Sequence, residues 1–277
     1  MNHIEGNFKG VRGAQIYYQA WLPAGEVKAV LIVTHGLGDH SGRYMNLVNY
    51  FVPLGYAIYS FDHLGHGKSE GAREVIERFE DFTSTLKIYY DMVMGWQPDK
   101  AIFLVGHSTG GLIACCYLLD YKEDFKGAVI SAPAIKAGAS ISPLVIRVSK
   151  ILSEIVPRMG MQALDTRAIS RDPQVVAAYA NDPLVFHGKT PARMAGELLK
   201  AIARVTAEVR SISHPFIVVQ GSQDRLVEPS GTQMLYEQAG SKDKTIKIYE
   251  GLYHEVFNEP ERDKVLSDME AWLAAHV

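Results

Sequence analysis

Short apolar runs alternate with longer amphipathic stretches along most of the 277-residue chain. The apolar runs are rich in β-branched and aromatic residues, which favours buried strands, and the stretches between them have the apolar spacing of helices. We predict strands at residues 17–21, 29–34, 56–61, 101–105, 127–131, 216–220 and 245–249. We predict helices at residues 44–52, 79–96, 112–121, 230–239 and 260–275. This alternation indicates an α/β fold with a mostly parallel sheet, in which only the first of these strands is expected to be antiparallel.

One long interval interrupts the alternation, because no convincing strand occurs between Ser131 and Phe216. Ordinary connections in α/β folds are much shorter. We interpret residues 135–210 as a helical cap inserted into a single core, which residues 1–134 and 211–277 form.

Within this cap, residues 143–156 have the apolar spacing of an amphipathic helix. Its apolar positions include Leu144, Val148, Leu152 and Ile155. The helix either packs on the core or serves as a lid that faces lipid or substrate and makes transient contact with a membrane or micelle.

The composition is that of an ordinary globular protein, with 47% hydrophobic and 21% charged residues. The net charge is -3, and Lys and Arg are spread along the chain, so we expect no nucleic-acid partner. Cys115 and Cys116 are adjacent and are the only cysteines, which excludes an internal disulfide framework. We find no apolar signal core and no apolar run long enough to span a bilayer, and we expect a cytoplasmic location, at most peripheral to a membrane.

The clearest chemical motif is G-x-S-x-G at residues 106–110, with an apolar strand pattern before it and a helical pattern after it. A sharp strand-to-helix turn holds the serine in a strained conformation, and the two glycines leave room for neighbouring backbone. The N-terminus of the helix offers N–H groups and a positive dipole end to an oxyanion. We therefore predict that Ser108 is the nucleophile of an α/β-hydrolase fold.

A serine hydroxyl needs a base to remove its proton, and the base needs an acid to hold its tautomer. In this fold the acid and then the histidine follow the serine, each after a later strand. Asp224 and His254 occupy these positions, and we predict them as acid and base. Glu228 remains the alternative acid. Four other residues fit the strand ends less well: His214, His276, Asp182 and His187.

A tetrahedral intermediate needs a second N–H donor, which this fold takes from the loop after an early strand. His35-Gly-Leu-Gly38 directly follows the predicted strand at residues 29–34. We predict the backbone N–H groups of Leu37 and Thr109 as the oxyanion hole, although the glycines could also serve only to form a turn. Residues 62–69 close the next strand at the same edge, and we interpret them as a structural brace.

Six stretches carry a resemblance that covers nearly the whole chain: residues 35–44, 61–71, 106–111, 181–184, 221–226 and 247–254. In these stretches the sequence resembles the monoacylglycerol lipase and lysophospholipase-like family of α/β hydrolases. The resemblance implies Ser108, Asp224 and His254 as a catalytic triad, and it implies Leu37 and Thr109 as the oxyanion hole. It also implies cleavage of lipid-like esters, most simply monoacylglycerol, through an acyl-enzyme, without a metal or cofactor.

The resemblance further implies a pocket for the glycerol end of a substrate and a cap over an apolar acyl path. Asp39, Arg43, His107 and Tyr179 are the candidates for the polar end, or they brace loops instead. Leu144, Val148, Leu152 and Ile155 are the candidates for the acyl path. The acyl length, the head group and the oligomeric state stay open.

Other functions remain possible on these residues. Ser-His-Asp chemistry also serves a lysophospholipase, a general carboxylesterase or a thioesterase, and a related fold can be a non-catalytic binding protein. A metal-dependent hydrolase could use His35, His40, His63 and His66, but the ligand spacing of lactamase-fold enzymes is missing. Neither Gly-x-Gly stretch, at residues 36–38 and 65–67, has the continuation of a dinucleotide-binding motif.

Overall fold

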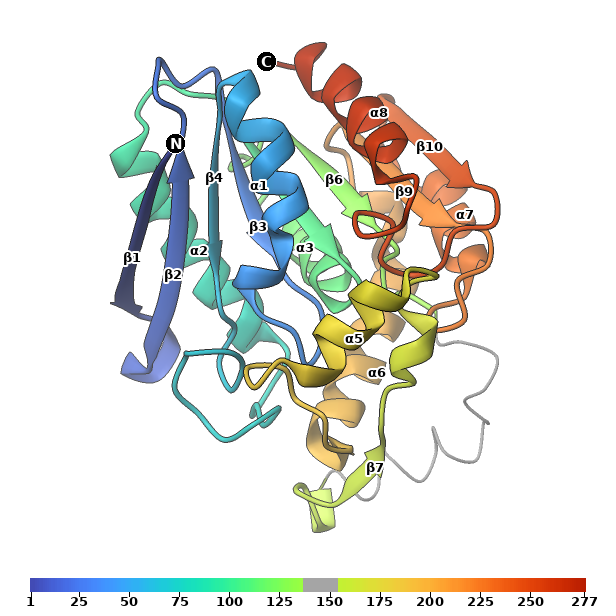
Figure 1. Cartoon of the computed structure of the whole chain (residues 1–277). Coiled ribbons are helices and arrows are strands. Elements are labelled where there is room, and N and C mark those ends of the chain that lie inside the picture. The colour runs from blue at the N-terminus through green and yellow to red at the C-terminus, as the bar shows by residue number, and fades with distance from the viewer. Residues whose placement is uncertain (137–153) are drawn as a thin grey trace.

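A central sheet with the strand order β1-β2-β4-β3-β5-β6-β9-β10 organises the protein (Figure 1). The structure is a computed structural model, and it describes residues 1–136 and 154–277. The strands of this sheet are β1 (Asn2–Lys9), β2 (Gln15–Leu22), β3 (Ala29–Thr34), β4 (Tyr56–Phe61), β5 (Ile102–His107), β6 (Gly127–Ser131), β9 (Phe216–Gly221) and β10 (Lys244–Tyr249). β1 and β2 pair antiparallel, as do β2 and β4, and the other pairs are parallel. The predicted α/β fold with a mostly parallel sheet is confirmed.

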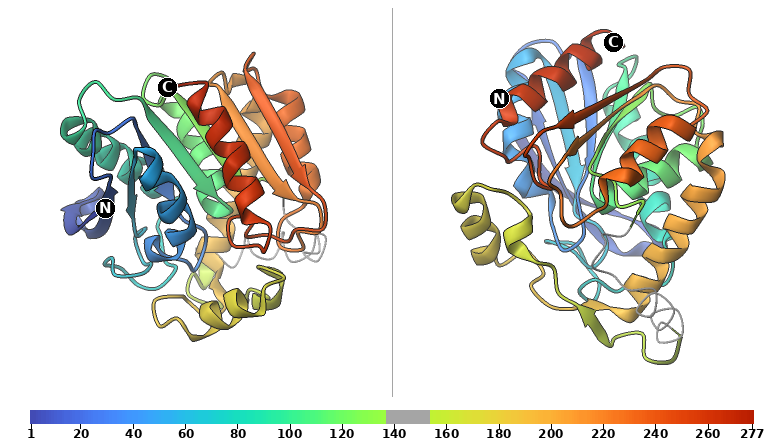
Figure 2. Two further views of the ribbon diagram at one scale, coloured as in Figure 1. Left: turned by 45° about the horizontal axis from the view of Figure 1, so that its top comes forward. Right: turned by 90° about the vertical axis from the view of Figure 1, so that its right-hand side faces the viewer.

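Helices cover both faces of the sheet, as the two views of Figure 2 show. One face carries α1 (Met45–Phe51) and α8 (Arg262–Ala274), whose buried residues form one apolar cluster with the sheet. The opposite face carries α2 (Glu80–Trp96), α3 (Thr109–Asp120), α6 (Ala192–Glu208) and α7 (Pro229–Gln238). β3, β4 and β5 are buried along their whole length, because both of their faces are covered.

The N-terminal strand β1 is not among the predicted strands. It lies at the edge of the sheet, and Phe8 is its only buried residue. An edge strand that packs so little side-chain surface has no apolar alternation, and the sequence pattern therefore could not reveal it.

The interval between β6 and β9 contains β7 (Gly160–Gln162), α5 (Pro173–Asn181), β8 (Thr190–Pro191) and α6 in the described residues. β7 and α5 lie at the end of the sheet towards which the parallel strands point (Figure 1), and β8 pairs with β7. By contrast, α6 packs along α3, and its residues Met194, Ala201 and Val205 join the core cluster.

Most of the predicted amphipathic helix at residues 143–156 lies outside the described residues. Leu144, Val148 and Leu152 are among residues 137–153 and have no described structure. Ile155 is described, and 71% of it is exposed.

Within residues 1–136 and 154–277, no helix is both long enough and apolar enough to cross a membrane.

Candidate active site

The turn between β5 and α3 holds Ser108 in a conformation that side chains rarely adopt, with φ 56° and ψ -118°. Only glycine fits at positions 106 and 110, two residues before and after the serine. A Cβ atom on Gly106 would lie 2.4 Å from the carbonyl oxygen of Gly110, and one on Gly110 would lie 2.1 Å from that of Thr34. Ser108 is partly exposed, whereas His107 and Thr109 are buried. The turn therefore presents the serine hydroxyl at the surface of the site.

Helix α3 begins at Thr109, three residues before the predicted start at Leu112. The prediction was late because glycines at positions 110 and 111 hide the apolar spacing of the first turn. The early start places the orphan N–H groups of the helix directly beside Ser108.

Asp224 and His254 meet at the carboxyl ends of β9 and β10. His254 Nδ1 lies 2.7 Å from Asp224 Oδ2. The carboxylate of Asp224 also accepts hydrogen bonds from the side chain of Gln220 and from the backbone N–H groups of Leu226 and Val227. These contacts fix Asp224 so that it orients the imidazole, and they leave His254 Nε2 as the acceptor nitrogen.

Burial and charge act against each other on this pair. Burial favours the neutral imidazole, but the charge and hydrogen bond of Asp224, with the charges of Glu255 and Asp39, outweigh it, and the pKa of His254 lies above the ordinary value. Burial likewise opposes ionisation of Asp224, but His254 and the two backbone N–H groups keep the pKa of its carboxyl below the ordinary value. Asp224 thus favours the imidazolium ion that forms when His254 accepts a proton.

The ring of His254 lies against the ring of His107, the residue before Ser108, with 4.7 Å between the centroids. Among the hydrogen bonds of the described residues, none joins the hydroxyl of Ser108 to His254. In ligand-free sites such bonds are often long and tighten when substrate binds.

The loop after β3 lies against the serine. A Cβ atom on Gly36 would lie 3.3 Å from the Cβ of Ser108, so the backbone of this loop comes close to the serine. No hydrogen bond within the described residues uses the backbone N–H of Leu37 or Thr109 as a donor. Both groups are therefore available to an oxyanion.

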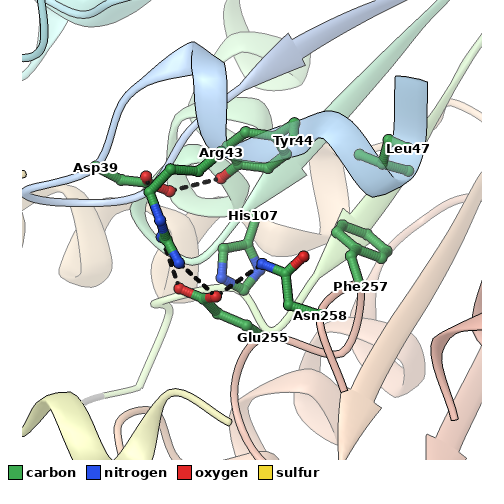
Figure 3. Close-up of a pocket in the computed structure, with 8 residues that line it drawn as sticks. All are labelled: Asp39, Arg43, Tyr44, Leu47, His107, Glu255, Phe257 and Asn258. Atoms are coloured by element: carbon green, nitrogen blue, oxygen red, sulfur yellow. Dashed lines mark hydrogen bonds and ion pairs between the residues drawn. The ribbon is translucent and has the colours of Figure 1, made fainter. Parts of the chain in front are cut away.

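A buried polar cluster lies next to this loop (Figure 3). Arg43 donates from Nη1 to Asp39 Oδ1 at 3.1 Å, and its guanidinium lies 4.5 Å from the centre of the Tyr179 ring. Burial opposes ionisation of Asp39, but Arg43 together with His35, His40 and a backbone hydrogen bond outweighs it, and the pKa of that carboxyl is lowered to about 2. His107 lines the same small cavity of about 10 Å³, which has room for about one water molecule. The structure thus brings Asp39, Arg43, His107 and Tyr179 together.

The sequence did not reveal three further members of this cluster: Tyr44, Glu255 and Asn258. Glu255 binds both terminal nitrogens of Arg43, with Nη1–Oε1 and Nη2–Oε2 distances of 2.8 Å. The only signal in the sequence was a carboxylate directly after His254. The sequence does not show that Arg43 is its partner.

His35, His63 and His66 of the loops after β3 and β4 pack against one another, and burial lowers the pKa of each. His35 donates from Nδ1 to the carbonyl of Gly36 and accepts from the backbone N–H of His63 at Nε2. Burial lowers the pKa of His66 to about 3. In the described ranges, no three His, Cys, Asp or Glu side chains are grouped to hold a metal ion.

Among the described residues, the remaining candidates form hydrogen bonds with partners other than His254. Glu228 precedes α7 and contacts Ser230. Asp182 instead binds His40, with 2.9 Å between Asp182 Oδ2 and His40 Nε2, and thereby joins the end of α5 to the loop after β3. His187 contacts the backbone of Asp182, and His276 pairs with Asp243.

Comparison with known proteins identifies the family. A family model described as serine aminopeptidase S33 matches residues 25–261. The chain belongs to this family. It is 36% identical to a monoacylglycerol lipase of Mycolicibacterium smegmatis, over 99% of this chain and 98% of that protein.

A monoglyceride lipase of Mus musculus is 35% identical, over 96% of this chain and 88% of its own. The crystal structure of a monoacylglycerol lipase of Paleococcus ferrophilus superposes with a TM-score of 0.85 at 28% identity, and all of each chain is covered. The S33-family chain is therefore an α/β hydrolase, and the resemblance inferred from its motifs is confirmed.

Proposed function

We propose that this protein is a serine esterase that hydrolyses monoacylglycerol-like lipid esters, with Ser108 as nucleophile, His254 as base and Asp224 as orienting acid. The arrangement around Ser108 carries the proposal. A strained, partly exposed serine lies beside a histidine that a buried aspartate holds at 2.7 Å, and beside two N–H groups that have no described acceptor. The names of the relatives, monoacylglycerol lipase and monoglyceride lipase, support the substrate class.

The reaction follows from these positions. His254 Nε2 removes the proton of Ser108, whose oxygen attacks the ester carbonyl, and the N–H groups of Leu37 and Thr109 bind the oxyanion. The imidazolium then gives its proton to the leaving alcohol. A water molecule then loses a proton to the same imidazole and attacks the acyl-enzyme; the imidazolium returns that proton to the oxygen of Ser108 as the fatty acid leaves.

We propose that the polar cluster of Figure 3 faces the head group of the substrate and that this head group is neutral. In the cluster of Figure 3, the one guanidinium of Arg43 is bound by the two carboxyl groups of Asp39 and Glu255. Because these acids already use its charge, Arg43 is not free to bind a phosphate, and the surplus carboxyl would repel one. This favours a polyol over a lysophospholipid.

We further propose residues 135–210 as the cap, with an apolar surface that contacts a membrane or micelle. The support is a short stretch before and after β7 that exposes Ile155, Val156, Met159 and Leu164, with exposed fractions of 71%, 39%, 42% and 42%. Apolar residues that are scattered singly over a surface need no explanation, but four exposed ones within ten positions indicate an interaction site. A surface that enters lipid would place the enzyme where its substrate dissolves.

The head-group proposal predicts a clear order of rates. We expect kcat/KM for a long-chain monoacylglycerol to exceed that for the lysophosphatidylcholine of the same chain by at least about tenfold, since a misplaced buried charge costs about 1.4 kcal/mol or more. Steady-state assays with p-nitrophenyl acetate to palmitate and an acyl-coenzyme A alongside separate a general esterase or thioesterase from a lipid esterase. Equal rates on both lipids would remove the neutral head group, and no turnover of any ester would favour a binding protein.

The membrane proposal predicts that exchange of Ile155 and Leu164 for serine weakens binding to phosphatidylcholine vesicles. Each buried apolar side chain contributes about 1.5–3 kcal/mol, so the double variant should lose tenfold or more in vesicle affinity. Sedimentation with vesicles measures this loss, and hydrolysis of dissolved p-nitrophenyl butyrate is the control that should stay unchanged. Unaltered sedimentation would show that this surface does not enter lipid.

A further inference from the structure

Glu255 lies directly after the proposed base, in the loop between β10 and α8, which we call the histidine loop (residues 250–261). Only 5% of Glu255 is exposed. A buried carboxylate is costly unless it is paired and hydrogen-bonded, so its contacts indicate what it holds.

Both carboxylate oxygens of Glu255 bind Arg43, which belongs to the segment between β3 and α1. The two N–O distances are 2.8 Å, and Asn258 Nδ2 donates to Oε2 at 2.8 Å as well. Two parallel hydrogen bonds between a planar guanidinium and a planar carboxylate fix the orientation of each group and not only their distance. The pair therefore clamps the histidine loop to the segment that contains Arg43.

The contacts continue from Arg43 to the proposed oxyanion loop (residues 35–40). Arg43 donates to Asp39, and the hydroxyl of Tyr44 donates to the other oxygen of that carboxylate at 3.1 Å. The backbone N–H of Gly36 in turn donates to the hydroxyl of Tyr44 at 3.3 Å. An unbroken series of buried polar contacts thus joins the residue after His254 to the residue before Leu37.

We infer that Glu255 is a positioning residue, which sets the position of His254 relative to the oxyanion loop through the clamp on Arg43. The inference rests on the proposed ester hydrolysis and adds a residue that the catalytic motifs do not contain. Glu255 has no contact with the ring of His254, which Asp224 holds at Nδ1. Its effect on the position of His254 is therefore transmitted through the backbone, whereas its charge acts on the imidazole through space.

The chemistry explains why such a clamp matters. The base must reach the serine hydroxyl while two N–H groups point at the oxygen that becomes negative, and the two requirements are met by different loops. A displacement of one loop by about 1 Å can cost a hundredfold in rate. An apolar contact between the loops would hold them together but would not fix their relative orientation.

Two substitutions separate position from charge. Glu255→Gln keeps the length of the side chain but removes its charge and one of the two paired acceptors, and Glu255→Asp keeps the charge but is one methylene too short for the clamp. We expect both variants to lose about ten- to a hundredfold in kcat for a monoacylglycerol, with KM changed much less.

The pH profile provides a second measurement. His254 acts as a base only when it is neutral, and the charge of Glu255 contributes to the raised pKa of its imidazole. Removal of that charge in Glu255→Gln should therefore lower this pKa and move the acid limb of kcat/KM to lower pH. Glu255→Asp should leave the limb near its wild-type position although its kcat falls.

Glu259 provides a matched control in the same loop. It is fully buried, and its carboxylate accepts from Arg171 N at 2.6 Å and from Arg171 Nε at 2.5 Å. Arg171 lies just before α5 and not in the oxyanion loop. Glu259→Gln thus breaks a comparable ion pair, and we expect it to lower the melting temperature while kcat and the pH profile stay close to wild type.

Three outcomes would overturn the inference. One is wild-type kcat in both Glu255 variants, and another is an equal loss of kcat in Glu255→Gln and Glu259→Gln. Full activity of Glu255→Asp with loss only in Glu255→Gln would assign a purely electrostatic role instead. These results leave the proposed function intact, because the wild-type enzyme turns over the ester in the same assay, whereas an inactive wild type removes both proposals.

Discussion

Replacing Ser108 with alanine is expected to lower kcat for ester hydrolysis by about three orders of magnitude or more, with the fold intact. The hydroxyl is the only group that can form the acyl-enzyme in the proposed reaction. Its removal costs little stability, since Ser108 is partly exposed and its side chain has no hydrogen bond among the described residues. The backbone strain at φ 56° remains in the variant.

The same loss is expected for His254→Ala and Asp224→Asn. The asparagine keeps the shape of the aspartate but can present an N–H group to Nδ1, which favours the wrong tautomer of His254. Stopped assays of kcat, with circular dichroism and melting temperature as folding controls, measure all three variants. Near-normal hydrolysis by Ser108→Ala would refute the triad.

Replacing Gly110 with alanine is expected to destabilise the protein by about 3 kcal/mol, the upper part of the range for overpacked cores, and to lower its activity. The added Cβ would lie 2.1 Å from the carbonyl oxygen of Thr34 and 2.7 Å from that of His35. Both contacts are with backbone, so no side-chain rotation relieves them. The chain must shift where β3 leads into the oxyanion loop, and the position of Leu37 must shift with it. Urea denaturation monitored by tryptophan fluorescence measures the lost stability.

Gly95→Ala is the matched control for this substitution. Gly95 is exposed near the end of α2, and a Cβ there meets no atom within 4 Å. Alanine loses less conformational freedom than glycine in a helix, so this variant should gain about 0.5–1 kcal/mol. A Gly110→Ala protein as stable as wild type would mean that the turn is less tightly packed than the structure describes.

The fold was largely predictable, because a strand buried on both faces is a nearly continuous apolar run. β3 and β4 lie at the predicted bounds, and β5 and β9 differ from the predicted ranges by a few terminal residues. β1 was missed for the reason given above, and the start of α3 was predicted late. In both places local pattern carries little information, since tertiary pairing or a neighbouring loop determines the backbone there.

The sequence alone was enough to identify the residues of the proposed catalytic triad. The order of Ser108, Asp224 and His254, each after a predicted strand, follows from the register of a parallel sheet, whose carboxyl ends lie at one edge. Such an argument needs only the chain order and the apolar runs. It predicted the pairing of Asp224 with His254, and it located the loop that contains Leu37.

Only the tertiary structure decided how the loops around these residues are joined. Glu255 and Arg43 are more than two hundred residues apart, and the pairing of Asp182 with His40 also spans a long separation. A charged residue in a sequence shows neither its burial nor its partner, because both depend on which surfaces the fold brings together. Neutralisation of Arg43 by two carboxyl groups, and with it the proposed choice of head group, is therefore a property of the folded chain alone.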